Sequence, residues 1–345
     1  MKYKLLAVST ESEVNIGDYI QALASSQFLP HIDGFIQREE LKDYNGEECT
    51  VIMNGWYMHN TQQWPPSPKI HPLYIATHFN TLAKNVLFSQ TSIRYLKQYE
   101  PIGCRDLYTK ELLIKNGIDA YFSGCMTLTL GNKYKVCEKE KKCYFVDPYF
   151  DTQWNLFSIL YNFIYLISHW TPINIISKKY PENKKGLRKK MILTTFYREY
   201  KHIFSKEILI NAEYICQQNK YYKEHFHNDE ERLLEAERLI KKYAKAQFVV
   251  TSRIHCALPC LGLETPVIYI ENGKQTEASS CRLGGLKDLF NIIIWKEGKL
   301  QAQFELFGKI NYNNIPQNLP KWKSLSISLI KTCKSFIERQ EKIRP

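Results

Sequence analysis

Hydrophobic positions along this chain follow two periodicities. Short runs of apolar and β-branched residues predict buried strands, and longer stretches with apolar residues three and four positions apart predict helices. The predicted strands cover 4–9, 35–38, 50–54, 73–77, 102–104, 121–125, 143–146, 191–196, 209–216, 248–251, 267–270 and 291–295. The predicted helices cover 15–28, 91–99, 107–116, 229–245 and 256–263. Alternating strands and helices predict an α/β protein with parallel, doubly wound sheets.

The composition shifts to Gly, Asn, Lys and Glu at 131–142, which predicts a domain boundary. We expect one Rossmann-like domain at 1–135 and a second at 136–320. A C-terminal helix at 321–345 is expected to pack back on the body. Its apolar stripe is Trp322, Leu325, Leu329, Cys333, Phe336 and Ile337.

The stretch 247–270 reads as strand, turn, helix and strand, with Arg253 and His255 where the first strand passes into the helix. Ligands of open α/β sheets bind at this edge. A helix N-terminus attracts anions, a guanidinium grips a carboxylate or phosphate through two hydrogen bonds, and an imidazole moves protons near neutral pH. The set suits a small anion that must be held and protonated. The alternative is a structural pair that caps carbonyls or binds a carboxylate.

Other polar residues also follow predicted strands. Asp18 is either an N-cap or a substrate ligand, and Gly17 permits an unusual backbone angle or close approach of a ligand. His78 is either a general acid or base or a structural histidine. The remaining candidates for substrate binding are Asn15, Asn54, Arg105, Glu271 and Lys274. The carboxyl ends of parallel strands share one edge of a sheet, so these side chains are expected to converge.

Three ordered motifs resemble the polysaccharide pyruvyl transferase family. The first is Asn-Ile-Gly-Asp at 15–18, and the second joins Pro-Ile-Gly-Cys-Arg-Asp at 101–106 to Ser-Gly-Cys-Met-Thr-Leu at 123–128. The third is Ser-Arg-Ile-His at 252–255, followed by Ala-Leu-Pro-Cys-Leu-Gly and Thr-Pro-Val-Ile. Arg-Leu-Gly-Gly-Leu at 282–286 resembles a further turn of the family.

The resemblance implies two Rossmann-like domains facing a cleft, as in GT-B glycosyltransferases. It also implies transfer of pyruvate from phosphoenolpyruvate to a sugar diol as a ketal. Arg253 would clamp the donor and His255 would protonate its methylene carbon, while His78, Asp18 or Glu271 would remove hydroxyl protons. The expected acceptor is a surface-polysaccharide repeat unit linked to undecaprenyl diphosphate. A nucleotide-sugar-dependent glycosyltransferase of the same pathway and a non-catalytic glycan-binding subunit remain alternatives.

The composition of the chain restricts the kinds of binding partner that we expect. Lys and Arg number 47 against 35 Asp and Glu, a net charge of +12, which fits an anionic partner. The chain shows no nucleic-acid-binding motif, so nucleic acid is not expected. Ten cysteines without a secretory leader predict a cytoplasmic protein. The sequence has no Cys-x-x-Cys pair or metal-ligand spacing, so neither a metal nor a cofactor is expected.

The segment 154–170 is apolar and aromatic but too short and polar for a transmembrane helix. Seven Lys or Arg residues against one acid, Glu182, follow it at 177–190. One interpretation is peripheral contact with the anionic inner face of the plasma membrane. The other is an ordinary core helix followed by a solvated loop.

Overall fold

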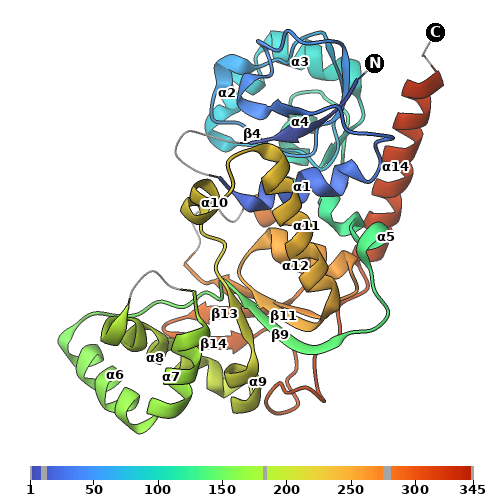
Figure 1. Cartoon of the computed structure of the whole chain (residues 1–345). Helices are drawn as coiled ribbons and strands as arrows, with labels where there is room; N and C mark the ends of the chain where they lie inside the picture. Colours follow the sequence, from blue (N-terminus) through green and yellow to red (C-terminus); the bar gives the residue numbers. More distant parts are fainter. Residues whose placement is uncertain (1, 9–13, 182–184, 275–280, 343–345) are drawn as a thin grey trace.

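The computed structural model describes residues 2–8, 14–181, 185–274 and 281–342. Figure 1 shows an N-terminal and a C-terminal part joined through helices. The N-terminal sheet is parallel, with strand order β2-β1-β3-β5. Its strands are β1 (Lys2–Ala7), β2 (Phe35–Gln37), β3 (Cys49–Ile52) and β5 (Ile70–Leu73). Two further parallel pairs are β4 (Trp56–Tyr57) with β6 (His78–Phe79) and β7 (Ile102–Cys104) with β8 (Ala120–Phe122).

The larger sheet has the order β10-β9-β11-β12-β13-β14. It consists of β9 (Glu140–Val146), β10 (Glu213–Ile215), β11 (Ala246–Thr251), β12 (Val267–Asn272), β13 (Asn291–Lys296) and β14 (Lys299–Ala302). All neighbours are parallel except β13 and β14. The predicted strand 291–295 is confirmed as β13, but the expectation that it is the last strand was wrong. Glu297 and Gly298 both have positive φ, which suits a two-residue hairpin turn, so the chain returns as β14.

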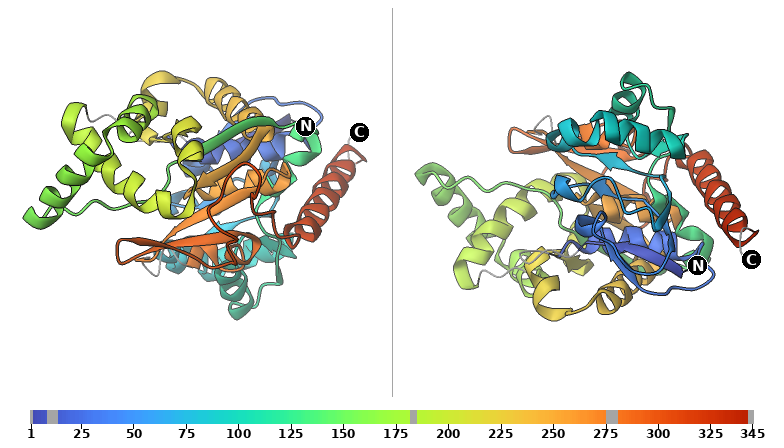
Figure 2. Two further views of the ribbon diagram at one scale, coloured as in Figure 1. Left: turned by 90° about the horizontal axis from the view of Figure 1, so that it is seen from below. Right: turned by 90° about the horizontal axis from the view of Figure 1, so that it is seen from above.

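Helices cover and join the sheets. Those of the first part are α1 (Ile16–Ser26), α2 (Lys84–Leu87), α3 (Gln90–Leu96), α4 (Leu107–Lys115) and α5 (Gly131–Tyr134). Between β9 and β10 lie α6 (Leu156–Ser168), α7 (Trp170–Lys179), α8 (Gly186–Ile203) and α9 (Lys206–Asn211). The last ones are α10 (Asn219–His225), α11 (Asp229–Lys245), α12 (Ile254–Gly262) and α14 (Trp322–Lys342). Figure 2 shows α6, α7 and α8 projecting sideways from the body.

Several predicted elements differ from the structure. The predicted strand 191–196 is wrong, because these residues lie inside α8. All six residues are buried, and a short buried run in a helix has the same apolar pattern as a buried strand. The Thr194 hydroxyl donates to the Lys190 carbonyl of the same helix at 2.8 Å. Most of 209–216 is likewise not strand. The predicted strand 73–77 is also misplaced, since β5 ends at Leu73 and Ala76 has a φ of 53°.

One hydrophobic core spans the two parts. It contains residues of α1, α11, α12 and α14. The Tyr19 hydroxyl of α1 donates to Asp229 Oδ1 of α11 at 2.5 Å, and Ser326 of α14 donates to the Leu128 carbonyl at 3.0 Å. The mixed α/β class with parallel sheets is confirmed, whereas the boundaries 1–135, 136–320 and 321–345 stay predictions. Among the described residues, no helix is both long and apolar enough to cross a membrane.

Candidate functional site

A cavity of about 250 Å³ lies where the N-termini of α1 and α12 approach each other. Its lining combines residues that are far apart in the sequence. The polar side chains that line it include Asn15, Arg105, Arg253, His255, Tyr269 and Arg282. Three guanidinium groups therefore border one small space, which makes the cavity strongly attractive to an anion.

Arg253 lies two residues after the end of β11 and is the N-cap residue of α12. Its Nε donates to Asp147 Oδ2 at 2.7 Å, and its Nη2 donates to the Gln217 carbonyl at 3.4 Å. The side chain is still 49% exposed, so the ion pair orients the guanidinium at the rim without removing it from solvent. No described side chain caps the first amide groups of α12, which leaves the helix N-terminus available to an anion.

His255 lies in the first turn of α12 and is buried. Its Nε2 atom has no hydrogen-bond partner among the described residues. Burial, followed by the positive charges of Arg105 and Arg282, holds the pKa of His255 well below its ordinary value. The imidazole is therefore neutral near pH 7 in this state. An anion in the cavity would oppose the two arginines and raise that pKa again.

Gly17 sits where α1 approaches this imidazole most closely. A Cβ at position 17 would come within 2.7 Å of His255 Nδ1 and 3.1 Å of Asn15 Oδ1. Asn15 is the N-cap residue, and its Oδ1 accepts from the Gly17 amide at 3.1 Å. The glycine is thus explained by close approach to His255. The backbone of residue 17 is helical and needs no unusual angle.

We expect Gly17→Ala to lower turnover by displacing the His255 imidazole. The added methyl group cannot be accommodated without a shift of this buried ring or of α1. The measurement is a double-mutant cycle of kcat with His255→Ala. If Gly17 acts through His255, adding Gly17→Ala to His255→Ala costs little further activity. Equal losses in both backgrounds, with unchanged melting temperature, contradict this role.

Arg105 adds a second unpartnered group to the cavity. Its side chain is buried, its Nη1 atom has no partner among the described residues, and its Nε lies 4.0 Å from Asp106 Oδ2. A buried guanidinium without full hydrogen bonding is costly. The unpartnered atoms of Arg105 and His255 therefore both indicate a ligand that accepts hydrogen bonds here.

A second hollow of about 210 Å³ adjoins the first, because Asn15 and Arg282 line both. Asp18, Trp56 and His59 also line it. The rings of Trp56 and His59 lie 4.4 Å apart. Burial raises the pKa of Asp18, although the charges of Arg38, Arg105 and Arg282 oppose this effect. The hollow thus offers an aromatic surface beside a carboxylate, which suits a sugar.

Asp18 is further held in place by Gln21, whose Nε2 donates to Asp18 Oδ1 at 3.0 Å. Opposite it, the Arg38 guanidinium lies 4.9 Å from the centre of the Trp56 ring. Arg38 also pairs with Glu39 at 2.8 Å. These contacts fix the orientation of both the carboxylate and the indole.

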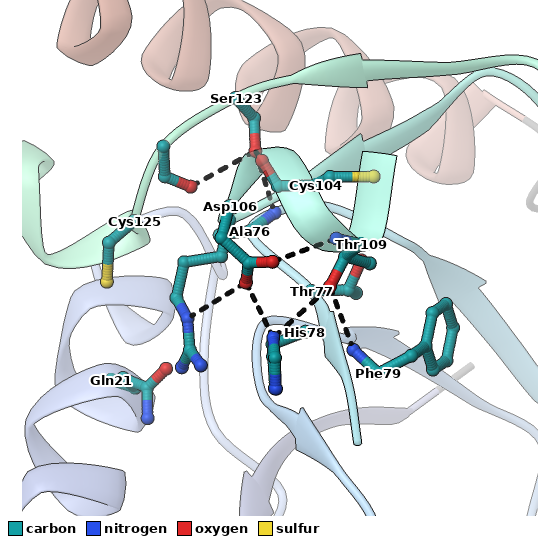
Figure 3. Close-up of polar contacts among 12 residues, drawn as sticks. Gln21, Ala76, Thr77, His78, Phe79, Cys104, Asp106, Thr109, Ser123 and Cys125 are labelled. Carbon is teal, nitrogen blue, oxygen red and sulfur yellow. Dashed lines mark hydrogen bonds and ion pairs between the residues drawn. The ribbon is translucent and has the colours of Figure 1, made fainter. Parts of the chain in front are cut away.

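His78 is placed differently. It is buried, and Figure 3 shows its Nδ1 bonded to Asp106 Oδ2, at 2.6 Å. Thr109 contacts the same nitrogen at 3.2 Å, and its amide donates to Asp106 Oδ1 at 2.9 Å. Burial lowers the pKa of His78 despite the bond to Asp106. His78 is not among the residues lining either hollow, so its geometry supports positioning of Asp106 and Arg105.

Three other residues that were predicted to bind substrate either contact other parts of the chain or lie outside the two hollows. Asn54 is buried, and its Nδ2 donates to the Gln21 carbonyl at 2.9 Å, which anchors α1. Glu271 pairs with Lys287. Lys274 is exposed, and its backbone amide donates to Asn272 Oδ1 at 2.9 Å. The structure therefore brings together Asn15, Gly17, Asp18, Arg105, Arg253 and His255.

Sequence reasoning missed Arg282, Arg38 and Asp147 as site residues. Asp147 directly follows β9, so the rule that sites form at strand ends applies to it. Arg282 lies within the recognised Arg-Leu-Gly-Gly-Leu motif, which offered a signal that was not used. Arg38 lies in a 3₁₀ turn, Arg38–Glu40, and no local pattern indicates its contact with Trp56.

A larger cavity, of about 570 Å³, lies between the end of α7 and α11. Its lining contains neither His255 nor Arg105, the two described residues of the smaller cavity with unpartnered side-chain atoms. Within the described ranges, no three His, Cys, Asp or Glu side chains form a group that would hold a metal ion.

Comparison with known proteins adds one finding. The model of the polysaccharide pyruvyl transferase family matches residues 15–274, about three quarters of the chain. The match covers both N-termini that meet at the cavity, those of α1 and α12. No curated protein and no solved structure matches this chain.

Proposed function

Because the chain belongs to the polysaccharide pyruvyl transferase family, we propose that it moves pyruvate from phosphoenolpyruvate to a sugar diol. Membership implies a transferase of polysaccharide biosynthesis. The single observation that carries the donor assignment is the small cavity bordered by Arg105, Arg253 and Arg282, with the unpartnered His255 Nε2 beside them. Its size and charge suit a three-carbon molecule with a carboxylate and a phosphate.

Donor binding follows from the arrangement of charges. Arg253 at the rim and the amide groups of α12 would bind one anionic group of phosphoenolpyruvate, and Arg105 with Arg282 the other. Phosphoenolpyruvate carries about three negative charges at neutral pH. These charges offset the field of the arginines, which raises the pKa of His255 on binding. The donor thereby helps to protonate the residue that acts on it.

In the proposed reaction, protonated His255 gives its proton to the methylene carbon of phosphoenolpyruvate. The C2 carbon becomes electrophilic, and a sugar hydroxyl forms a C–O bond to it while losing its proton. The C2–O bond to phosphate breaks, and phosphate leaves with both bonding electrons and the proton that the first hydroxyl lost. A second hydroxyl of the same sugar then forms the other C–O bond at C2, and the proton from its broken O–H bond restores protonated His255. The products are a pyruvate ketal and inorganic phosphate.

We place the acceptor in the second hollow, beside Trp56 and His59. Sugars bind well on aromatic faces next to carboxylates. Among the three predicted bases, Asp18 lines this hollow, whereas His78 is bonded to Asp106 and Glu271 to Lys287. The raised pKa of Asp18 makes it a better proton acceptor than an ordinary aspartate. Asp18 is therefore the proposed base for the attacking hydroxyl.

The finer parts of the proposal concern architecture and context. The two larger sheets, which are parallel except for β14, and a cavity lined from both parts of the chain support a GT-B-like arrangement of two Rossmann-like domains. The acceptor is proposed to be a repeat unit linked to undecaprenyl diphosphate on the cytoplasmic side of the plasma membrane. Asn54, Glu271 and Lys274 stay predictions as substrate ligands. The proposed chemistry needs neither a metal nor a cofactor, because three arginines neutralise the donor.

The test is incubation of the full chain with phosphoenolpyruvate and a panel of lipid-linked and synthetic sugar diols. We expect phosphate release together with a pyruvyl ketal on the sugar, detected by mass spectrometry. Phosphate release without the ketal contradicts the transfer. The alternative glycosyltransferase is tested in parallel: stabilisation against heat by a nucleoside diphosphate, without stabilisation by phosphoenolpyruvate, would favour it.

A further inference from the structure

Helix α6 carries an apolar face that nothing in the described chain covers. Of its thirteen residues, Asn162 and Leu166 are the buried ones. Six large apolar side chains are between 43% and 84% exposed, namely Leu156, Phe157, Leu160, Phe163, Ile164 and Ile167. We call these six residues the α6 face. Monomeric soluble proteins rarely expose a continuous apolar surface of this kind without a partner.

The inner side of α6 consists of one polar residue, Asn162, and one apolar residue, Leu166, which packs in the same core as residues of α8. Asn162 faces α8, where its Oδ1 accepts from Arg198 Nη1 at 2.7 Å and its Nδ2 donates to Thr195 Oγ1 at 3.4 Å. An ordinary surface helix turns its apolar stripe inward. The start of α6 is well formed, because Asn155 Oδ1 accepts from the Ser158 amide at 2.9 Å. The helix is therefore held in an orientation that presents its apolar side outward.

Cations lie over the aromatic rings that border the α6 face. Lys190 lies 3.9 Å from the centre of the Trp170 ring, and Arg188 lies 5.9 Å from that of Trp154. On the other flank, Lys201 lies 4.8 Å from the Tyr165 ring. Trp154 and Trp170 are 49% and 47% exposed at the two ends of the helix. Tryptophan and basic residues around an apolar helix are typical of the interface between lipid tails and headgroups.

A basic cavity of about 500 Å³ adjoins the same helix. Tyr161 and Tyr165 line it on the α6 side, and Arg198, Lys201 and Lys299 supply positive charge. Glu199 also lines it and is paired with Arg198 at 2.6 Å. The cavity can hold a phosphate headgroup next to the apolar face.

We propose that the α6 face inserts into the surface of a bilayer rich in anionic lipids, with a lipid phosphate in the adjoining basic cavity. The segment 154–203 contains nine Lys or Arg residues and two acids, which fits an anionic surface. A second copy of the chain fits less well. A symmetric interface places the same patch opposite itself, so the excess positive charges of both copies would repel each other.

A series of connected cavities links the donor site to the helices beside the α6 face. The role that we infer for this link rests on the proposed function. Ser252 and Arg253 line both the donor cavity and a cavity of about 380 Å³. Tyr180, Cys216 and Gln218 connect the latter to the cavity of about 570 Å³, which Lys189 of α8 also lines. A continuous set of hollows thus leads from Arg253 to α8, which contacts α6. A lipid-linked acceptor could follow it from the membrane to the donor.

The test is co-sedimentation of the full chain with vesicles of phosphatidylcholine alone or mixed with phosphatidylglycerol. We expect binding to the anionic vesicles that weakens at high salt. The double variant Leu160→Glu with Ile164→Glu should bind at least about tenfold more weakly. Its matched control is Ile327→Glu, because Ile327 is 68% exposed on α14, away from this face. Lys190→Gln with Lys201→Gln should weaken binding only to anionic vesicles, with Lys323→Gln as the control.

Two further measurements separate the outcomes. Turnover of phosphoenolpyruvate with a soluble sugar acceptor should be unchanged in the Leu160→Glu, Ile164→Glu variant. If the wild-type chain ignores all vesicles but turns over a soluble acceptor, the membrane proposal fails and the proposed function stands. If the chain binds vesicles but transfers no pyruvate, the proposed function fails and the membrane proposal stands. A wild-type dimer that this variant abolishes, without vesicle binding, would assign the α6 face to a second copy instead.

Discussion

Replacing His255 by Gln is expected to lower kcat by about a hundred- to ten-thousand-fold, the usual contribution of a positioned general acid. Glutamine keeps polar atoms in the buried position but cannot give a proton to carbon. The protein should stay folded, since Nε2 of His255 makes no hydrogen bond in the described structure. Steady-state kinetics with phosphoenolpyruvate, together with the melting temperature, check this. A variant that keeps full activity removes His255 from the mechanism.

The same residue gives a measurable pH dependence. In the free protein burial and two arginines hold the pKa of His255 well below 6.5, so the imidazole is neutral near pH 7. If the donor raises this pKa above the working pH, binding takes up about one proton per phosphoenolpyruvate. The dissociation constant then rises with pH in the window between the free and bound pKa values. Calorimetry in buffers of different ionisation enthalpy measures the uptake, and His255→Gln should abolish it.

Replacing Arg253 by Ala is expected to weaken phosphoenolpyruvate binding by about a hundredfold. Two hydrogen bonds to a charged group contribute roughly 3 kcal/mol together, which corresponds to that factor. The loss also removes the ion pair with Asp147 at 2.7 Å, whose Oδ2 still accepts from the Gln217 amide at 2.9 Å. Stability should change little because the Arg253 side chain is 49% exposed. Titration calorimetry or KM for the donor measures the effect.

Two variants control the Arg253 result. Arg253→Lys keeps the charge but loses the planar fork, so its affinity should lie between those of the wild type and the alanine variant. Arg339→Ala removes an exposed charge on α14 and should bind the donor normally. Donor affinity unchanged in Arg253→Ala, or lowered equally in Arg339→Ala, would show that Arg253 does not bind the donor specifically.

The elements that the sequence predicted best are those whose pattern is local. Helix α11 spans Asp229–Lys245, as its apolar periodicity predicted, and β11 and β12 appear where short apolar runs were found. Even there, Leu234 is 65% exposed, although its neighbour Leu233 packs against the core. A period of 3.6 residues defines a face only to within one position, so the exact boundary of burial depends on the neighbouring elements.

The hydrophobic pattern predicted the wrong element where a helix, and not a strand, is buried. Met191–Phe196 looked like a strand because it is a short run of mostly apolar and β-branched residues, yet a helix whose residues are all buried gives the same run. His78 shows a different limit. Its position in the chain left a general acid or base and a structural histidine both open, and the structure places it against Asp106 and Thr109. Sequence spacing cannot show which partner a side chain meets.

The sequence by itself determined the α/β class, the family and the position of Arg253 and His255 where β11 passes into α12, because these depend on short-range order of residue types. Only the tertiary structure decided that Arg105 and Arg282 join that pair, that Gly17 is small to admit an imidazole, and that α6 turns its apolar side outward. Each of these is a contact between segments distant in the chain. Such contacts depend on how whole layers pack, and no local periodicity encodes them.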